Sequence, residues 1–198
     1  ETKNIHCGTG GALIINNKKY INNAKIISNK GTNRHQFEKG KASKYKWMNI
    51  GSSYKINELS SILLYKNLKN FEFIEKKRTL VCSIYFKNLQ ELALKGLIKF
   101  PLYNRKSNYK SSHIFFFFVK KFLRNKLLKY LNKKKINETF HYLPLCVSPF
   151  FKEKNKKKNL NSIKAANEII RLPVYPNLKK KEQAYIIKKL KEFFTINK

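Results

Sequence analysis

The spacing of apolar residues along the chain predicts alternating helices and strands. Leu123, Leu127 and Leu131 recur at helical intervals, whereas Ile114–Val119 is a short apolar run typical of a strand covered on both faces. Asn57 is placed to cap a helix. In chain order, the predicted elements are a buried strand at 12–15, a helix within 20–30, a loop over 31–53, a helix from 57 to about 94, a strand at 113–119, a helix over 122–131, a strand at 139–145, a helix over 163–170 and a helix over 186–194.

These elements favour a globular α/β protein without a membrane-spanning helix. The longest apolar run ends at Lys120, far short of the roughly 20 residues that a bilayer requires. The first residues carry no apolar segment, so we expect no signal peptide. The three cysteines, Cys7, Cys82 and Cys146, are odd in number and widely spaced, which suits a reducing compartment. We therefore expect a cytoplasmic location.

The charge of the chain changes this picture only in part. Its 44 Lys and Arg residues against 11 Asp and Glu residues give a formal charge of +33, which is typical of a nucleic-acid-binding protein. Nearly all of these cations are lysine. The chain is rich in Lys, Asn, Ile, Phe and Tyr, whose codons are rich in A and T, as is typical of proteins from an AT-rich genome. We interpret the charge as mutational bias on solvated faces, from which a non-specific affinity for polyanions still follows. A lysine-rich nucleic-acid-binding protein stays an alternative, although we expect no specific nucleic-acid partner.

Pattern alone identifies no catalytic centre. The glycine-rich segment 8–11 matches neither the dinucleotide fingerprint nor the P-loop, and a tight turn is its simplest interpretation. The pairs His6–Cys7 and His141–Cys146 lack the short ligand spacing of a zinc site, so we expect no metal. No carboxylate pair and no nucleophile elbow stands out.

Four ordered blocks resemble a known enzyme family. Residues 1–13 are similar to the S-F-H-x-T-K-N motif and the G-E-G-G-A-like turn of the DegT/DnrJ/EryC1/StrS sugar aminotransferases, which use pyridoxal phosphate and have fold type I. Residues 30–54 resemble the K-G-T-N-R and K-Y-T-W-V-D-I-G-S-S-Y stretch of one branch, the dTDP-4-amino-4,6-dideoxygalactose (dTDP-4-oxo-6-deoxy-D-glucose) transaminases. Residues 141–145 resemble H-Y-x-P-L, and residues 171–175 resemble R-L-P-L-F/Y.

The resemblance implies a reaction, a cofactor and a catalytic lysine. The lysine that matches Lys3 binds pyridoxal 5'-phosphate covalently and then moves the proton between substrate and cofactor. The implied reaction aminates C4 of a dTDP-4-keto-6-deoxy sugar, with glutamate as donor, in the biosynthesis of a surface polysaccharide such as enterobacterial common antigen. The intact enzymes are homodimers, and each site draws on both subunits.

The resemblance also implies the remaining site residues. Ser53 would contact the cofactor phosphate across the dimer interface. The sugar nucleotide would be bound by residues of the loop and of the small domain, namely Arg34, Tyr45, Trp47, Tyr54, His141 and Tyr142. The chain departs from the family pattern at Thr9, Asn49, Cys146 and 60–62, which affects the fine structure of the pocket.

The chain is similar to the C-terminal part of these enzymes only. We expect residues 1–56 to be the end of the cofactor-binding large domain, 57–95 the connecting helix region and 96–198 the small α/β domain. The other half of a relative carries the Asp that pairs with the pyridine nitrogen and most phosphate ligands. The alternative is therefore an inactive C-terminal remnant, and we expect these residues alone not to hold the cofactor tightly.

Overall fold

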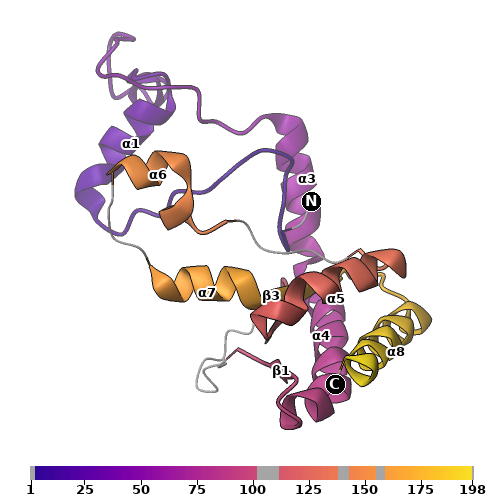
Figure 1. The fold of residues 1–198 in the computed structure, drawn as a ribbon. Helices are drawn as coiled ribbons and strands as arrows, with labels where there is room; N and C mark the ends of the chain where they lie inside the picture. Colours follow the sequence, from indigo (N-terminus) through magenta and orange to yellow (C-terminus); the bar gives the residue numbers. More distant parts are fainter. Residues whose placement is uncertain (1–2, 102–111, 138–142, 155–158, 198) are drawn as a thin grey trace. The chain divides into compact units, whose positions relative to one another are not determined.

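The chain divides into two units. The computed structural model describes residues 3–101, 112–137, 143–154 and 159–197 (Figure 1). One unit comprises Glu1–Phe71 and the other Glu72–Lys198. The division falls within 57–95, where we expect the connecting helix region, and the three domain boundaries stay a prediction. Within the described ranges, no helix combines the length and the apolar character needed to cross a bilayer.

The first unit consists of short helices and loops. It contains η1 (Lys18–Tyr20), α1 (Ile21–Ser28), α2 (Arg34–Phe37) and α3 (Glu58–Lys69). The helix expected within 20–30 is confirmed by α1, and Asn57 caps α3 by accepting a hydrogen bond from the Ser60 amide at 2.8 Å. Among the described residues of this unit, Ile26 is the single buried hydrophobic residue, at 8% exposure.

The strand predicted at 12–15 is wrong. These residues have no regular structure, and Leu13 and Ile14 are 78% and 84% exposed. A strand needs a neighbour for its backbone groups, and within the described ranges the one sheet is formed by strands of the second unit. The apolar run is therefore an exposed surface of this chain.

The long helix predicted from 57 to about 94 is interrupted at Asn70. Helix α3 ends at Lys69, and α4 (Phe71–Leu94) begins directly after Asn70. The Asn70 side chain donates to the Lys66 carbonyl at 2.9 Å, so that it competes with the backbone for the acceptors that close a helix. The sequence pattern of apolar residues continues across this point, which is why it predicts one helix.

A three-stranded antiparallel sheet forms the centre of the second unit. Its order is β1 (Ile98–Lys99), β2 (Phe115–Val119) and β3 (Ile169–Leu172), with Phe117 opposite Ile170. The prediction of a covered strand is confirmed by β2, since its residues alternate between fully and partly buried. The core joins this sheet to α4, α5 (Lys121–Lys133) and α8 (Lys180–Ile196).

The remaining predictions in this unit are confirmed in part. Helix α7 (Leu160–Glu168) ends earlier than expected, because Ile169 and Ile170 pair with Phe118 and Phe117 in the sheet. The strand expected at 139–145 is wrong at its end, where η2 (Leu145–Val147) begins, and 138–142 lie outside the described residues. Helix α6 (Pro149–Lys154) follows η2.

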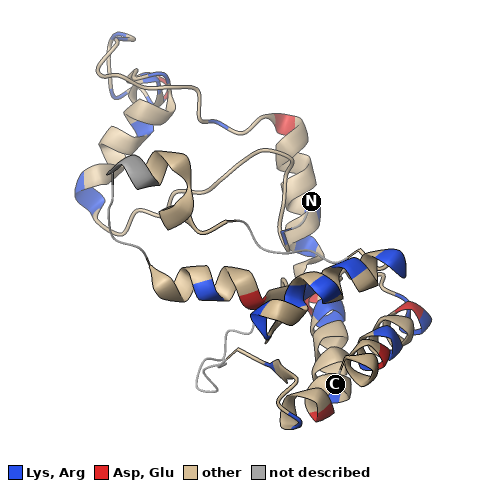
Figure 2. Cartoon of the chain, viewed as in Figure 1, with Lys and Arg blue, Asp and Glu red and all other residues tan. Residues whose placement is uncertain are grey.

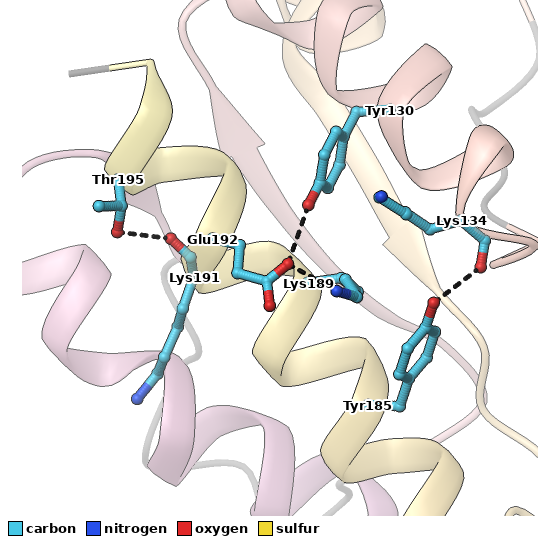
Figure 3. Close-up of polar contacts among 7 residues, drawn as sticks. All are labelled: Tyr130, Lys134, Tyr185, Lys189, Lys191, Glu192 and Thr195. Carbon is cyan, nitrogen blue, oxygen red and sulfur yellow. Dashed lines mark hydrogen bonds and ion pairs between the residues drawn. The ribbon is translucent and has the colours of Figure 1, made fainter.

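Helices α5 and α8 are joined by polar contacts at their edges (Figure 3). The Tyr130 hydroxyl donates to Glu192 at 3.2 Å, and Glu192 also pairs with Lys189 at 2.7 Å. The Tyr185 hydroxyl donates to the Lys134 carbonyl at 3.3 Å. These bonds fix the pairing of the two helices above their shared apolar contact.

Candidate active site

The candidate site is built on a tight turn that follows α1. Lys30 and Gly31 both have positive φ, at 60° and 75°. The Gly31 amide donates to the Ile26 carbonyl at 2.9 Å, which closes the last turn of the helix. After the turn, α2 packs against α1, where the Gln36 side chain donates to Asn22 Oδ1 at 3.1 Å.

The loop 46–54 lies directly on this turn. A Cβ atom on Gly51 would collide with the Gly31 nitrogen and lie 2.5 Å from the Ile27 carbonyl oxygen. A Cβ on Gly31 would collide with the Asn49 carbonyl and lie 2.9 Å from Nε1 of Trp47. Both glycines are therefore required by close backbone approach. The two sequence blocks that contain them form one structural element.

Asn33 fastens the loop to the turn. It is 4% exposed; its Oδ1 accepts from the Lys46 amide at 2.7 Å and its Nδ2 donates to the Lys44 carbonyl at 3.0 Å. The Asn33 amide donates to the Lys46 carbonyl at 3.1 Å, and Thr32 forms a β-bridge with Trp47. The sequence analysis assigns no role to Asn33, although Asn33 belongs to the K-G-T-N-R block and asparagine is common in turns.

Arg34 extends to the surface beside this element. Its Nε donates to Glu38 Oε1 at 2.7 Å, and both side chains are about half exposed. The hydrogen bond to Glu38 raises the pKa of Arg34, and the nearby Tyr45 adds a smaller rise. The same bond lowers the pKa of Glu38. Glu38 is a site residue that the sequence analysis missed, although its i,i+4 spacing from Arg34 is typical of such a pair.

The predicted aromatic residues are exposed on the loop. Tyr45 packs edge-on against Phe37 with ring centroids 6.4 Å apart. Trp47 and Tyr54 are 79% and 70% exposed. The loop backbone, and not side-chain burial, holds these rings in place. Such large exposed apolar surfaces are typical of a binding or contact face.

Ser53 lies at the end of the same loop. It forms a β-bridge with Asn29, and the neighbouring Tyr54 amide donates to the Ser28 carbonyl at 3.2 Å. Its side chain is exposed, and its hydroxyl has no hydrogen-bond partner within the described ranges. Ser53 is thus positioned by the C-terminal end of α1.

Lys3 belongs to a segment that is fastened to α3. The Asn67 side chain donates to the His6 carbonyl at 3.1 Å, and a Cβ on Gly10 would lie 3.9 Å from Ile56. Lys3 is exposed, and among the described residues no ion pair or hydrogen bond engages its ammonium group. The structure brings Arg34, Tyr45 and Trp47 together, but no such contact within the described chain joins them to Lys3. His141 and Tyr142 lie outside the described residues.

Curated relatives match the whole chain at low identity. An uncharacterized protein of Methanocaldococcus jannaschii is 24% identical over 100% of this chain and 53% of its own length. A pleiotropic regulatory protein of Geobacillus stearothermophilus is 25% identical over 98% of this chain and 50% of its own length. The chain therefore spans about half the length of these relatives.

Solved structures establish the fold. The aminotransferase TlmJ of Streptoalloteichus hindustanus has a TM-score of 0.79 at 14% identity, over 93% of this chain and 47% of its own. NtdA of Bacillus subtilis, solved with bound PMP, has a TM-score of 0.77 at 21% identity, over 90% and 40%. PseC of Helicobacter pylori, an aminotransferase of pseudoaminic acid biosynthesis, has a TM-score of 0.76 at 20% identity, over 91% and 47%. The predicted fold class, a fragment of the α/β aminotransferase fold, is confirmed.

A family model accounts for nearly the entire chain. The DegT/DnrJ/EryC1/StrS aminotransferase family matches residues 1–191, which include Lys3, the loop 46–54 and the three strands of the sheet. The chain belongs to the DegT/DnrJ/EryC1/StrS aminotransferase family.

Proposed function

We propose that this chain is the C-terminal part of a pyridoxal-phosphate-dependent sugar aminotransferase that aminates C4 of a dTDP-4-keto-6-deoxy sugar. Glutamate would be the amino donor, and the product would enter a surface polysaccharide of the enterobacterial common antigen type. The carrying observation is the packing of Gly51 on Gly31, which unites blocks 30–34 and 44–54 into one element. That element carries four of the residues that the family resemblance assigns to the sugar nucleotide, namely Arg34, Tyr45, Trp47 and Tyr54.

The residues of the chain fit the proposed cofactor. Covalent attachment of pyridoxal phosphate requires an accessible amine that can react with its aldehyde group. Lys3 is exposed and has no ion-pair partner in the described chain. A phosphate requires hydrogen-bond donors, and the exposed Ser53 hydroxyl is available for that purpose. Following the family resemblance, we propose that Lys3 of one subunit and Ser53 of the partner subunit serve the same site of a homodimer.

The chemistry divides between the cofactor and the chain. The bound cofactor would supply an electron sink for the carbon that gains or loses a proton. Lys3 would carry that proton, first as base and then as acid, and its flexible stem lets Nζ reach both positions. Ser53 of the partner subunit would bind the phosphate and so hold the cofactor ring in a fixed position relative to Lys3.

The loop would bind the sugar nucleotide. Arg34 has guanidinium N–H groups beyond the one bonded to Glu38, and a pyrophosphate accepts such donors in pairs. Tyr45, Trp47 and Tyr54 offer exposed rings for the base and the sugar. We propose that His141 and Tyr142 approach the substrate from the small domain.

One alternative fits the same observations. Since the chain spans about half of its relatives, a C-terminal remnant without activity of its own fits the same family match. The fold and the loop geometry are common to both proposals. We also propose a cytoplasmic location, because the three cysteines are odd in number and widely spaced.

The proposal is tested with the protein made from the complete reading frame that contains these residues. Incubation with dTDP-4-keto-6-deoxyglucose and glutamate should yield a C4-amino sugar detectable by mass spectrometry. Arg34→Gln should raise KM for the sugar nucleotide by roughly tenfold or more, because it removes a charged donor. Glu38→Gln should lower KM, because it releases Arg34. No product, with cofactor bound, would overturn the proposed substrate, and no cofactor bound would favour the remnant.

A further inference from the structure

The exposed face of α5 carries lysine without compensating acid. Its buried side holds Leu123, Leu127 and Leu131 in the core. Apart from Phe122, the exposed residues of this helix are cationic or amide residues, namely Lys121, Asn125, Lys126, Lys129, Asn132 and Lys133. Figure 2 shows Lys and Arg repeated along this helix. We name Lys121, Lys126, Lys129 and Lys133 the α5 lysine stripe.

The stripe differs from the other lysine-rich helix of this unit. Helix α8 contains Glu182 and Glu192, and Glu192 pairs with Lys189 at 2.7 Å. Helix α5 contains no acidic residue, and within the described ranges no ion pair engages a lysine of the stripe. Its positive potential is therefore not neutralised locally.

An exposed aromatic ring lies at one end of the stripe. Phe122 is 66% exposed and borders a hollow of about 380 Å³ that is also lined by Lys121, Arg124, Asn125 and Asn167. An exposed ring beside cations is the arrangement on which an unpaired base stacks while its phosphates are neutralised. Arg124 is turned toward the Ile169 carbonyl and Asn125, so the face has no arginine free to read base edges bidentately.

We propose that the α5 face binds single-stranded nucleic acid without sequence specificity. The lysine stripe would contact phosphates along the strand, since its neighbouring lysines are three to five residues apart, which is about one helical turn. Phe122 would stack with one base above the hollow. An anionic membrane is the weaker occupant, because the apolar face of α5 is buried in the core and cannot enter lipid. This surface lies in the second unit, and its function is independent of the aminotransferase proposal.

The test measures binding of the whole chain to a fluorescein-labelled 20-nucleotide oligothymidylate by anisotropy at several salt concentrations. Replacing the stripe by glutamine (K121Q, K126Q, K129Q and K133Q) should weaken binding on the order of 100-fold at 0.1 M salt and reduce the salt slope by roughly 3. Phe122→Leu should weaken it roughly fivefold at unchanged slope. Circular dichroism confirms that each variant is folded.

A matched variant separates this surface from the overall charge. K76Q, K87Q, K99Q and K188Q remove the same charge from exposed lysines of the same unit. This variant should retain the affinity and the salt slope to within a few-fold. Equal losses in both quadruple variants would overturn the proposal, as would binding to phosphatidylserine vesicles without binding to the oligonucleotide.

Discussion

Gly51 packs against the backbone of Gly31 so closely that neither position can carry a side chain. The contact joins two segments that are separate in sequence and places the loop 46–54 across the end of α1. It explains why both sequence blocks contain a glycine at these points. The positions of Arg34, Trp47 and Tyr54 all depend on it.

Gly51→Ala should destabilise the first unit by at least ~2 kcal/mol, because the methyl group overlaps backbone atoms that cannot rotate away. Trp47 is the only tryptophan, and its indole nitrogen lies near Gly31, so its fluorescence reports on this element. The measurement is urea unfolding followed at the Trp47 emission. Gly11→Ala is the control, since a Cβ there meets nothing within 4 Å. Equal midpoints for both variants would show that the loop does not lie on the turn.

Asn33→Ala should loosen the loop without unfolding the second unit. It removes the hydrogen bonds to the Lys46 amide and the Lys44 carbonyl, a loss of about 1–3 kcal/mol for a buried polar group. Amide hydrogen exchange at Lys46 should accelerate, and Phe117 in the sheet should stay protected. Asn16→Ala, at an exposed position, is the matched control. Unchanged protection of Lys46 would contradict the role of Asn33.

The Cys82 thiol should be unreactive in the folded chain. Burial raises its pKa from 9.0 to about 11, against a smaller lowering by the hydrogen bond to Ser112. At pH 8 its alkylation should be roughly 100-fold slower than in the urea-unfolded chain, because the thiolate reacts. Since the folded pKa is the higher one, the neutral thiol contributes stability that is complete below pH 9 and lost as pH rises toward 11. Equal alkylation rates in both states would contradict the burial of this group.

Helices with a regular repeat of apolar residues could be predicted from the sequence. The leucines of α5 and the apolar stripe of α8 mark the core side directly, and Asn57 marks the start of α3. These features are local, so neighbouring residues determine them. The strand β2 was equally clear from its continuous apolar run.

Elements that depend on a distant partner could not be predicted. Ile169 and Ile170 continue the helical pattern of α7, but their pairing with β2 makes them a strand. Leu13 and Ile14 have a strand pattern without a neighbouring strand in the described chain. For such segments, tertiary pairing overrides local preference.

The candidate site likewise depends on contacts between segments that are distant in sequence. The resemblance names Arg34, Tyr45 and Trp47, and the structure brings them together on one element. The residues that build the element, Asn33 among them, act through backbone contacts that no motif describes. The roles of Lys3 and of the other named residues stay predictions.

The central claim is that Lys3 is the lysine to which the cofactor attaches. The direct measurement is borohydride reduction of the cofactor-loaded protein from the complete reading frame, followed by peptide mapping. We predict one pyridoxyl group on Lys3, lost in Lys3→Arg and retained in Lys18→Arg, which alters another exposed lysine of the same unit. The isolated 198 residues should be labelled far below stoichiometry. A stoichiometric label on any other lysine, or an unchanged label in Lys3→Arg, would contradict the account.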